Sequence, residues 1–405
     1  MQNRRFIAEG HLIDSGILAK ILNLIIEEGA DYTIHEFTIG KTNLNPSHLD
    51  IEIHAGTTDL VDGVTKKLVQ IGCYEKAVGE AVCAAAPADG CVPDEFYSTT
   101  NHRTEVFIGG TWKEVSDQRM DGVIVVFDGK ARCKKLRDVA KGDLIVCGAE
   151  SVRVFPPQRE RHADLFGFMS GDVSSERSVD VAVAKIAEEF RAEKKRGGRI
   201  IAVAGPVVIH TGGGPALAAL VREGYIQGLL SGNALAVHDI ESVLYGTSLG
   251  VDLVTGRPTP DGHKNHMRAI NAVRRNGSIK SAVQAGIIDR GVMFEVVRFG
   301  IPYCLAGSIR DDGPLPETET DMIRAQKGYA DVIKGASMVI MLSSMLHSIG
   351  TGNMLPSYVK TICVDINPAV VTKLSDRGSS QTIGIVSDVG LFIRALADKL
   401  GVSLK

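Results

Sequence analysis

Residues that could contact a ligand stand directly after several apolar, β-branched runs of this chain. They are Asp365 at the end of 361–365, Asp388 after 383–387, and Ser344, Met345, Leu346 and His347 after 337–342. Parallel strands share one carboxyl edge, where ligands bind, and an acid there can accept hydrogen bonds from both ribose hydroxyls of an adenosine. The acid disfavours a 2′-phosphate, so the pattern predicts NAD rather than NADP. Helix N-caps at both aspartates, and a hydrophobic turn at 344–347, fit the sequence equally well.

A second group of residues is suited to acid–base chemistry. His238, Asp239 and Glu241 lie on a predicted helix that begins at Asn233 and Ala234. Histidine exchanges protons near neutral pH, and carboxylates can bind or deprotonate amines. We expect Asp239 or Glu241 to handle substrate amines and His238 to assist proton transfer. The alternative is that both acids are ordinary residues of a helix surface.

One arginine and two acids follow the strand predicted at 301–306. Arg310 can hold a carboxylate in a bidentate manner, while Asp311 and Asp312 can hold an amine. The turn is therefore a candidate site for an amino acid, although a solvated turn would use the same residues.

The segment 210–215 (HTGGGP) brings three glycines to a helix start. Glycines allow backbone N–H groups to converge on an anion at a helix N-terminus. The segment does not match G-x-G-x-x-G, and a tight turn explains the glycines equally well. His263 and His266 have spacing that can bind metal, but no carboxylate accompanies them, so we expect no metal.

The candidate residues above can form one site only if a sheet places them on the same edge. Strands are predicted near 200–209, 226–230, 301–306, 337–342, 361–365 and 383–387, alternating with helices. After a helix at 175–195, this alternation predicts an α/β domain over 156–405, with a doubly wound, Rossmann-like parallel sheet.

The N-terminal part has a different pattern. Strands at 6–12, 32–39, 49–54 and 80–85 and helices at 15–28 and 57–71 predict a ferredoxin-like α+β domain over 1–95. Short strands separated by Gly and Asp turns predict a small β-barrel or extension over 96–155.

The composition excludes several classes of protein. A net charge of −3 from 45 basic and 48 acidic residues gives no drive toward nucleic acid or membrane surfaces. No apolar run reaches the length of a membrane span, and the N-terminus lacks a signal-peptide core. Seven cysteines without a CxxC motif indicate a reducing, cytoplasmic location.

Long motifs of this sequence resemble one known family. They are EGHLIDSGILAKIL, FTIGKTNLNPSHLDIEI, LLSGNALAVHDIE, GHKNHMRAINAV, AGSIRDDGPLPET, SSMLHSIGTGN and TICVDINP. Together they resemble the archaeal NAD-dependent ornithine cyclodeaminases, whose relatives carry the name LOR/SDH bifunctional enzyme conserved domain. The resemblance covers essentially the whole chain.

The resemblance implies a deoxyhypusine-synthase-like C-terminal domain that holds NAD and converts L-ornithine to L-proline and ammonia. The implied NAD contacts are Asn233, Ala234, Asp312, Ser344, Met345, Leu346, His347, Asp365, Asp388 and Val389. A homo-oligomer is expected. Some cyanobacterial relatives carry an additional arginine dihydrolase domain, and this sequence starts directly at the EGHLID segment, so we expect no action on arginine.

Two other functions remain open at this point. An NAD-dependent amine transferase like deoxyhypusine synthase would need a lysine acceptor, and Lys334 and Lys360 are the lysines expected near the strand tips. The other alternative, a non-catalytic protein that senses NAD and an amino acid, would need no lysine acceptor. Ammonia release from ornithine would distinguish an ornithine cyclodeaminase from both of these alternatives.

Overall fold

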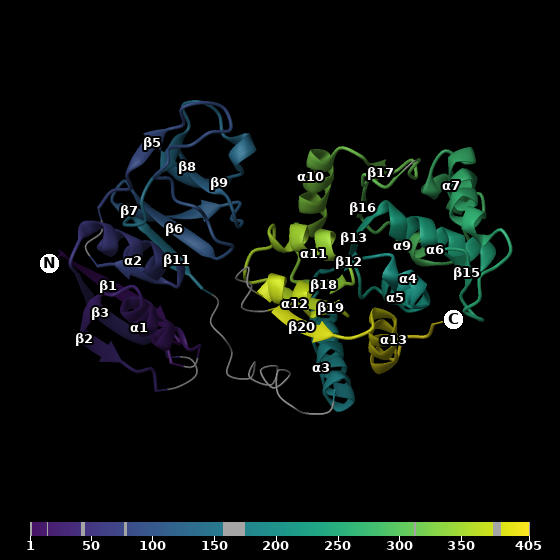
Figure 1. The fold of residues 1–405 in the computed structure, drawn as a ribbon, viewed down its shortest axis with the longest axis horizontal. Coiled ribbons are helices and arrows are strands. Elements are labelled where there is room, and N and C mark those ends of the chain that lie inside the picture. The colour runs from purple at the N-terminus through teal and green to yellow at the C-terminus, as the bar shows by residue number, and fades with distance from the viewer. Residues whose placement is uncertain are drawn as a thin grey trace. The chain divides into compact units, whose positions relative to one another are not determined.

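The computed structural model describes residues 2–13, 15–41, 45–76, 79–156, 175–311, 313–375 and 382–404. They form two compact units (Figure 1), which we treat separately. The N-terminal unit contains the described residues up to 156 together with 353–358, and the C-terminal unit contains 175–352 and 359–404. Asp312, one of the expected NAD contacts, lies outside the described residues.

The N-terminal unit begins with a ferredoxin-like β-α-β-β-α-β fold. Its elements are β1 (Gln2–Gly10), α1 (Ile17–Glu27), β2 (Asp31–Thr38), β3 (Ser47–Ala55), α2 (Thr58–Gln70) and β4 (Cys73–Glu75). The sheet has the order β2-β3-β1-β4, and both helices pack on one hydrophobic core that includes Phe6, Ile21 and Leu68. The last strand of this sheet was predicted at 80–85, which is wrong: a strand forms at Cys83–Ala85 but belongs to the second sheet, and the fourth strand here is β4, which follows α2 directly.

A second sheet of seven short strands completes this unit. They are β5 (Cys83–Ala85), β6 (Arg103–Ile108), β7 (Thr111–Ser116), β8 (Val123–Phe127), β9 (Lys130–Lys134), β10 (Leu144–Val146) and β11 (Val152–Phe155). All pairs are antiparallel except β7 with β9. Val106, Ile124, Val146 and Val154, from four of these strands, share one core, as in a small β-barrel.

The C-terminal unit is built on a parallel sheet with the order β17-β16-β13-β12-β18-β19-β20. The strands are β12 (Ile200–Ala204), β13 (Gly228–Gly232), β16 (Tyr303–Ala306), β17 (Thr318–Glu319), β18 (Met338–Leu342), β19 (Lys360–Asp365) and β20 (Thr382–Val386). β12 and β18 are buried at every position, as expected of strands covered on both faces.

Helices cover both faces of this sheet (Figure 1). On one side lie α10 (Met322–Ile333), α11 (Met345–Gly352) and α12 (Pro368–Ser375). On the other lie α3 (Ser175–Lys195), α5 (Gly214–Arg222), α9 (Val292–Arg298) and α13 (Val389–Leu400). The unit also contains α4 (Val207–His210), α6 (Asn233–Tyr245), α7 (Asn265–Arg275), α8 (Ile279–Gln284) and a small antiparallel pair, β14 (Thr247–Ser248) with β15 (Val251–Asp252).

The direction in which strands are added reverses between β12 and β18. From β12 the chain proceeds to β13 and β16 on one side, and later from β18 to β19 and β20 on the other. This is the Rossmann arrangement, in which ligands bind at the carboxyl ends of the strands beside the reversal. The predicted fold class is confirmed for this unit.

The first strand of the sheet is shorter than predicted. A strand was predicted over 200–209, but β12 ends at Ala204 and the apolar residues that follow form α4. A buried apolar run does not distinguish a strand from a short helix. The glycine-rich turn then packs tightly: a Cβ on Gly213 would come within 2.7 Å of Ile393, and Arg394 donates to the carbonyl oxygens of Thr211 and Gly212. Close packing therefore accounts for these glycines without an anion.

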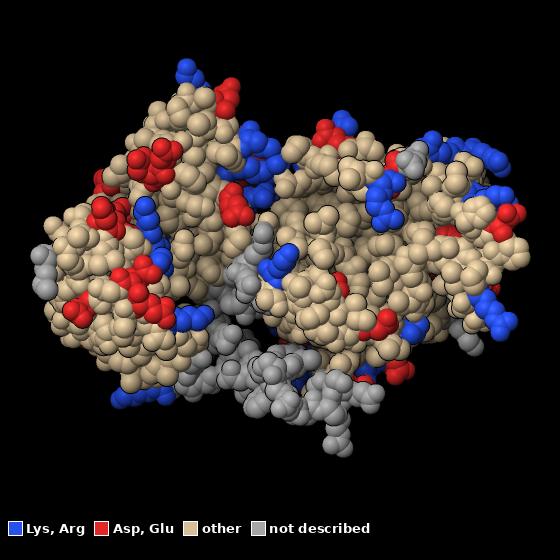
Figure 2. All heavy atoms as spheres, viewed as in Figure 1, with Lys and Arg blue, Asp and Glu red and all other residues tan. Residues whose placement is uncertain are grey.

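Charged side chains of both signs are mixed on the visible face of each unit (Figure 2). Among the described residues, no helix is long and apolar enough to cross a membrane.

The contact between the loops after β12 and β18 gives a test of this architecture. A Cβ at Gly205 would lie 2.0 Å from the carbonyl oxygen of Ser343, so Gly205→Ala must push the two loops apart. We expect the free energy of unfolding to fall by about 1–3 kcal/mol, the usual scale for overpacking.

Gly350→Ala is the matched control, because a Cβ at this position in α11 meets nothing within 4 Å. Alanine there should leave stability unchanged or raise it by up to about 1 kcal/mol. Urea unfolding measures both, and equal stability of the two variants would contradict the packing described here.

Candidate functional site

Two loops meet at the reversal point of the parallel sheet. The Gly205 N–H donates to the carbonyl oxygen of Leu342, and the Ser343 N–H donates to that of Val364, both at 2.9 Å. Ser343 has a φ of 44°, a left-handed conformation that is uncommon for a residue with a side chain. Such backbone strain occurs most often at ligand sites. The turn directs the residues after β18 out of the sheet.

Those residues offer both hydrogen-bonding and apolar surface. The hydroxyl oxygens of Ser344 and Ser348 are buried and have no hydrogen-bond partner among the described residues. Buried hydroxyls are normally bonded, so an additional polar group is expected next to them. Met345 and Leu346 are instead 45% and 78% exposed. Large apolar side chains left in solvent can pack against a flat ring.

Asp365 ends β19 on the same edge and is 8% exposed. Its Oδ1 accepts a hydrogen bond from the Asn367 N–H at 2.8 Å, which shapes the turn into α12. Among the described residues, no group donates to Oδ2, so this oxygen is open to a ligand hydroxyl. A carboxylate, two unpaired hydroxyls and exposed apolar groups on one strand edge fit the chemistry of NAD.

The side chain of Asn233 makes three hydrogen bonds inside the protein. Its Oδ1 accepts from the Leu315 N–H and the Thr318 hydroxyl, both at 3.0 Å, and its Nδ2 donates to Asp311 at 3.1 Å. Asn233 therefore holds the loop after β16 against the start of α6. Ala234 is half-buried beside it. A ligand here would meet backbone groups rather than the Asn233 amide.

The remaining residues predicted at this edge fall into different environments. Asp388 is the N-cap of α13 and accepts from the Leu391 N–H at 2.8 Å, while Val389 is buried. Arg310 is exposed and makes no ion pair within the described part of the chain. Asp388 thus has the capping role that the sequence left open, and Arg310 is free to bind an anion.

His238 and Glu241 form a buried pair on α6. The His238 Nδ1 lies 2.8 Å from Glu241 Oε2, and their side chains are 10% and 0% exposed. Burial acts to raise the pKa of Glu241, but the hydrogen bonds from His238, Gly250 and Thr247 outweigh it and hold the pKa below its usual value. An ionised carboxylate only accepts, so Nδ1 carries the proton and donates it. In the neutral ring, His238 Nε2 is then left as a proton acceptor.

Glu241 itself has no capacity left for a substrate. Besides His238, it accepts from the Thr247 hydroxyl at 2.8 Å, the Gly250 N–H at 2.9 Å and the Leu249 N–H at 3.2 Å. Four donors saturate its two oxygens. The role that this geometry supports is to orient His238.

Two further histidines adjoin this pair. The ring of His210, at the end of α4, lies 4.8 Å from that of His238, and the ring of His266 lies 6.5 Å from it. The His210 Nδ1 is 2.7 Å from the Ser248 hydroxyl. Burial and the neighbouring His238 lower the pKa of His210 to about 4, so this ring is neutral near pH 7. α4 follows β12 and α6 follows β13, so both helices begin at the carboxyl edge of the sheet, beside the reversal point.

Asp239 lies away from this cluster. Its carboxylate accepts from the Val292 N–H at 2.9 Å and the Met293 N–H at 2.8 Å, so it caps the start of α9. Burial raises its pKa to about 6, although the two N–H donors oppose the shift. The structure therefore brings His238 and Glu241 together and places Asp239 elsewhere.

Sequence reasoning missed several members of the cluster. His210 is the first residue of the segment 210–215, in which only the glycines suggested a function. Asn265, which donates to the Thr247 hydroxyl at 2.9 Å, lay between two histidines that were weighed as metal ligands. Among the described residues, no group of three or more His, Cys, Asp or Glu side chains is arranged to hold a metal ion.

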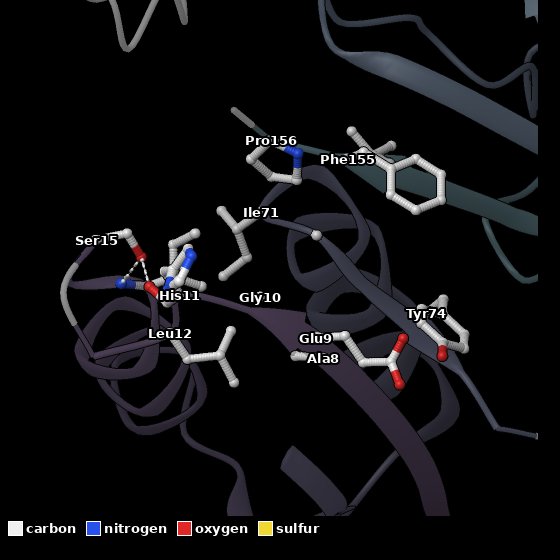
Figure 3. A pocket seen from close by; sticks show the side chains of 13 residues that line it. Ala8, Glu9, Gly10, His11, Leu12, Ser15, Ile71, Tyr74, Phe155 and Pro156 are labelled. Carbon is white, nitrogen blue, oxygen red and sulfur yellow. Dashed lines mark hydrogen bonds between the residues drawn. The ribbon is translucent and has the colours of Figure 1, made fainter. Parts of the chain in front are cut away.

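The N-terminal unit has a cavity of its own (Figure 3). Its volume is about 80 Å³, and its walls include Ile71, Phe155 and Pro156. Glu9, turned towards Tyr74 in Figure 3, is paired with His48 at 3.2 Å and is 57% exposed. The described residues predicted to bind a cofactor or carry chemistry all lie in the C-terminal unit, so we assign the candidate site to that unit.

Comparisons with protein families cover almost the whole chain. Residues 184–396 match the Rossmann-fold C-terminal region of ArgZ-like arginine dihydrolases, and 103–183 match the first region of the same C-terminal part. Residues 3–102 match the LOR/SDH bifunctional enzyme conserved region.

Individual relatives give the same result. The chain is 51% identical to a protein of Methanocaldococcus jannaschii named ornithine cyclodeaminase, over 96% of this chain and 94% of the relative. The protein of that name from Methanothermobacter thermautotrophicus is 49% identical, over 99% and 98%. Among solved structures, apo ArgZ, a cyanobacterial arginine dihydrolase, has a TM-score of 0.85 at 44% identity, over 99% of this chain and 58% of ArgZ.

The structure of AgrE in a ternary complex with ornithine and NAD+ has a TM-score of 0.55 at 45% identity, over 99% of this chain and 57% of AgrE. A full-length identity near one half, with matching regions in the same order, leaves no other family to consider. The chain belongs to the ornithine cyclodeaminase family, which includes archaeal proteins of this length and the C-terminal parts of ArgZ and AgrE.

Proposed function

We propose that this protein is an ornithine cyclodeaminase that converts L-ornithine to L-proline and ammonia with NAD as its resident cofactor. The observation that carries the proposal is the full-length similarity to proteins of that name and to AgrE, whose complex holds ornithine and NAD+. Bound NAD supplies a reversible two-electron oxidation at Cα of the substrate, which makes the overall reaction redox-neutral.

The residues that would hold NAD lie along the carboxyl edge of the parallel sheet. Asp365 Oδ2 would accept from the adenosine ribose, and Ser344 and His347 would meet the cofactor at the reversal point. The Asn233 amide and the Asp388 carboxylate already have partners, so at Asn233, Ala234, Asp388 and Val389 we propose contacts through backbone N–H groups at the helix starts. Asp312 completes the proposed set.

Proton transfer is assigned to His238. Oxidation at Cα requires a neutral α-amine, so a base must take a proton from the substrate ammonium. Glu241 fixes the His238 tautomer in which Nε2 of the neutral ring is the acceptor. Arg310 is proposed to bind the substrate carboxylate. Ring closure between the δ-nitrogen and Cα is intramolecular and needs little further acid–base assistance.

The two alternative functions have less support. Lys360 is the first residue of β19 and is paired with Glu189 at 2.5 Å, and Lys334 precedes β18. Both were expected near the strand tips, which is wrong, because they lie at the amino ends of the strands. Neither Lys334 nor Lys360 therefore reaches the candidate site, where an amine-transfer reaction would need a lysine. The orientation of His238 by Glu241 favours an enzyme over a sensor.

Location and assembly are also proposed from the sequence. All seven cysteines are free. Unpaired thiols are usual in a reducing compartment, so we propose a cytoplasmic enzyme. A homo-oligomer remains a prediction.

The ribose contact can be tested with Asp365→Asn. Asparagine keeps an oxygen for the Asn367 N–H but loses the charged acceptor for a ligand hydroxyl. We expect NAD affinity to fall roughly 5- to 150-fold, which corresponds to about 1–3 kcal/mol for a hydrogen bond to a charged group. Calorimetric titration measures the affinity for NAD, and Asp289→Asn, at an exposed aspartate, is the control. Equal NAD affinity in both variants would remove Asp365 from the site.

His238 and Asp239 are neighbours in sequence with different proposed roles. His238→Ala should lower kcat at least about a hundredfold, as expected for a lost base. Asp239→Asn leaves one acceptor for two N–H groups of α9 and should lower the free energy of unfolding by about 1–3 kcal/mol.

The folded Asp239→Asn enzyme should turn over ornithine at close to the wild-type rate. Ammonia release and urea unfolding, measured on both variants, separate the two roles. A hundredfold loss of kcat in folded Asp239→Asn would instead place Asp239 in the chemistry, as the sequence-based hypothesis has it.

A further inference from the structure

Tyr329 on α10 connects two elements of the candidate site. Its hydroxyl lies 2.7 Å from the Ser231 carbonyl oxygen in β13 and 2.8 Å from Nδ1 of His347 on α11. The tyrosine is 5% exposed, and the Ser231 backbone is buried as well. Ninety-eight positions separate Tyr329 from Ser231 in the sequence, so only the fold brings them together.

These two contacts determine where the protons lie. A carbonyl oxygen only accepts, so the single hydroxyl proton of Tyr329 is donated to Ser231. The Tyr329 oxygen can then only accept from His347, and Nδ1 must carry a proton. Burial lowers the pKa of His347, which keeps the ring neutral. In a neutral ring with a proton on Nδ1, Nε2 has a free lone pair.

The free nitrogen faces the tip of β13. A Cβ on Gly232 would come within 2.9 Å of His347 Nε2, so the absence of a side chain at Gly232 makes room for the ring. Gly232 is also the N-cap of α6 and the last residue of its strand. Nε2 therefore points at the carboxyl edge of the sheet, beside the reversal point. A ligand there can satisfy it with an O–H or N–H donor.

We propose that Tyr329 is a positioning residue that fixes His347 as a hydrogen-bond acceptor for the nicotinamide half of the cofactor. The proposal rests on the proposed function. With Asp365 on β19 holding the adenosine half, the nicotinamide half would lie towards β18, β12 and β13, which follow β19 in the sheet. Its carboxamide and its ribose hydroxyls are donors of the required kind. A protonated or reversed imidazole would present N–H instead and lose this bond.

The tautomer is measured directly in the protein without ligand. Nitrogen-15 NMR of protein labelled at histidine distinguishes protonated Nδ1 from protonated Nε2, and His347→Gln identifies the signal. We expect protonated Nδ1 in the wild type and a shift towards protonated Nε2 in Tyr329→Phe. A His347 signal that is identical in both proteins, or protonated Nε2 in the wild type, overturns the proposal.

Ligand binding tests the consequence. Tyr329→Phe and His347→Asn should weaken NAD binding roughly three- to tenfold, the scale of one hydrogen bond, and leave AMP binding unchanged. His347→Gln can place its amide oxygen near the Nε2 position and should retain more affinity than His347→Asn. Tyr245→Phe, at a partly exposed tyrosine on the same unit, is the matched control.

The outcomes separate this proposal from the proposed function. Wild-type protein that binds no NAD and releases no ammonia from ornithine contradicts the function and leaves the tautomer result standing. Normal NAD affinity in Tyr329→Phe, with an active wild type, overturns only the role of Tyr329. Equal losses of NAD and AMP binding would show general damage to the site and also overturn it.

Discussion

The close contact between the loops after β12 and β18 is the constraint on which the site depends. Gly205 lies against the Ser343 carbonyl with no room for a side chain, and Ser343 adopts a left-handed conformation to complete the turn. Because the order of strands reverses here, the helices on either side diverge and leave an open edge. α4 and α6 bring the histidine cluster to that edge, and α11 brings His347.

Polar groups near this edge fall into two kinds. Glu241 has all its acceptor sites taken by donors of the protein itself, and Asn233 and Asp239 make hydrogen bonds that hold neighbouring elements in place. His238 Nε2, His347 Nε2 and Asp365 Oδ2 have open acceptor capacity. Preorganised acceptors supported by saturated neighbours are what a site needs to bind a cofactor and move protons without rearrangement.

Most of the parallel sheet was predictable because its strands are continuous buried runs bounded by polar turns. Asp365 and Ser344 were placed at strand tips for that reason. The end of β12 was not predictable, since the apolar residues of α4 suit a buried helix and a buried strand equally. β4 was missed because three residues carry almost no pattern.

The side-chain roles were harder to predict because they depend on distant partners. Asp239 was expected to handle substrate amines or to lie on a helix surface, yet it caps α9, whose first residues are fifty-three and fifty-four positions away. Tyr329 gave no local signal at all. The domain limits near 95 and 155 and the contacts assigned to each site residue remain predictions.

The central claim is that the enzyme oxidises ornithine at Cα and later reduces the same carbon with the electrons it has stored. Ornithine with deuterium at C2 tests this most directly, by mass spectrometry of the proline formed in ordinary water. The account predicts proline that retains deuterium at C2, one ammonia per turnover and no net formation of NADH. Proline whose C2 carries only hydrogen from the solvent would contradict it.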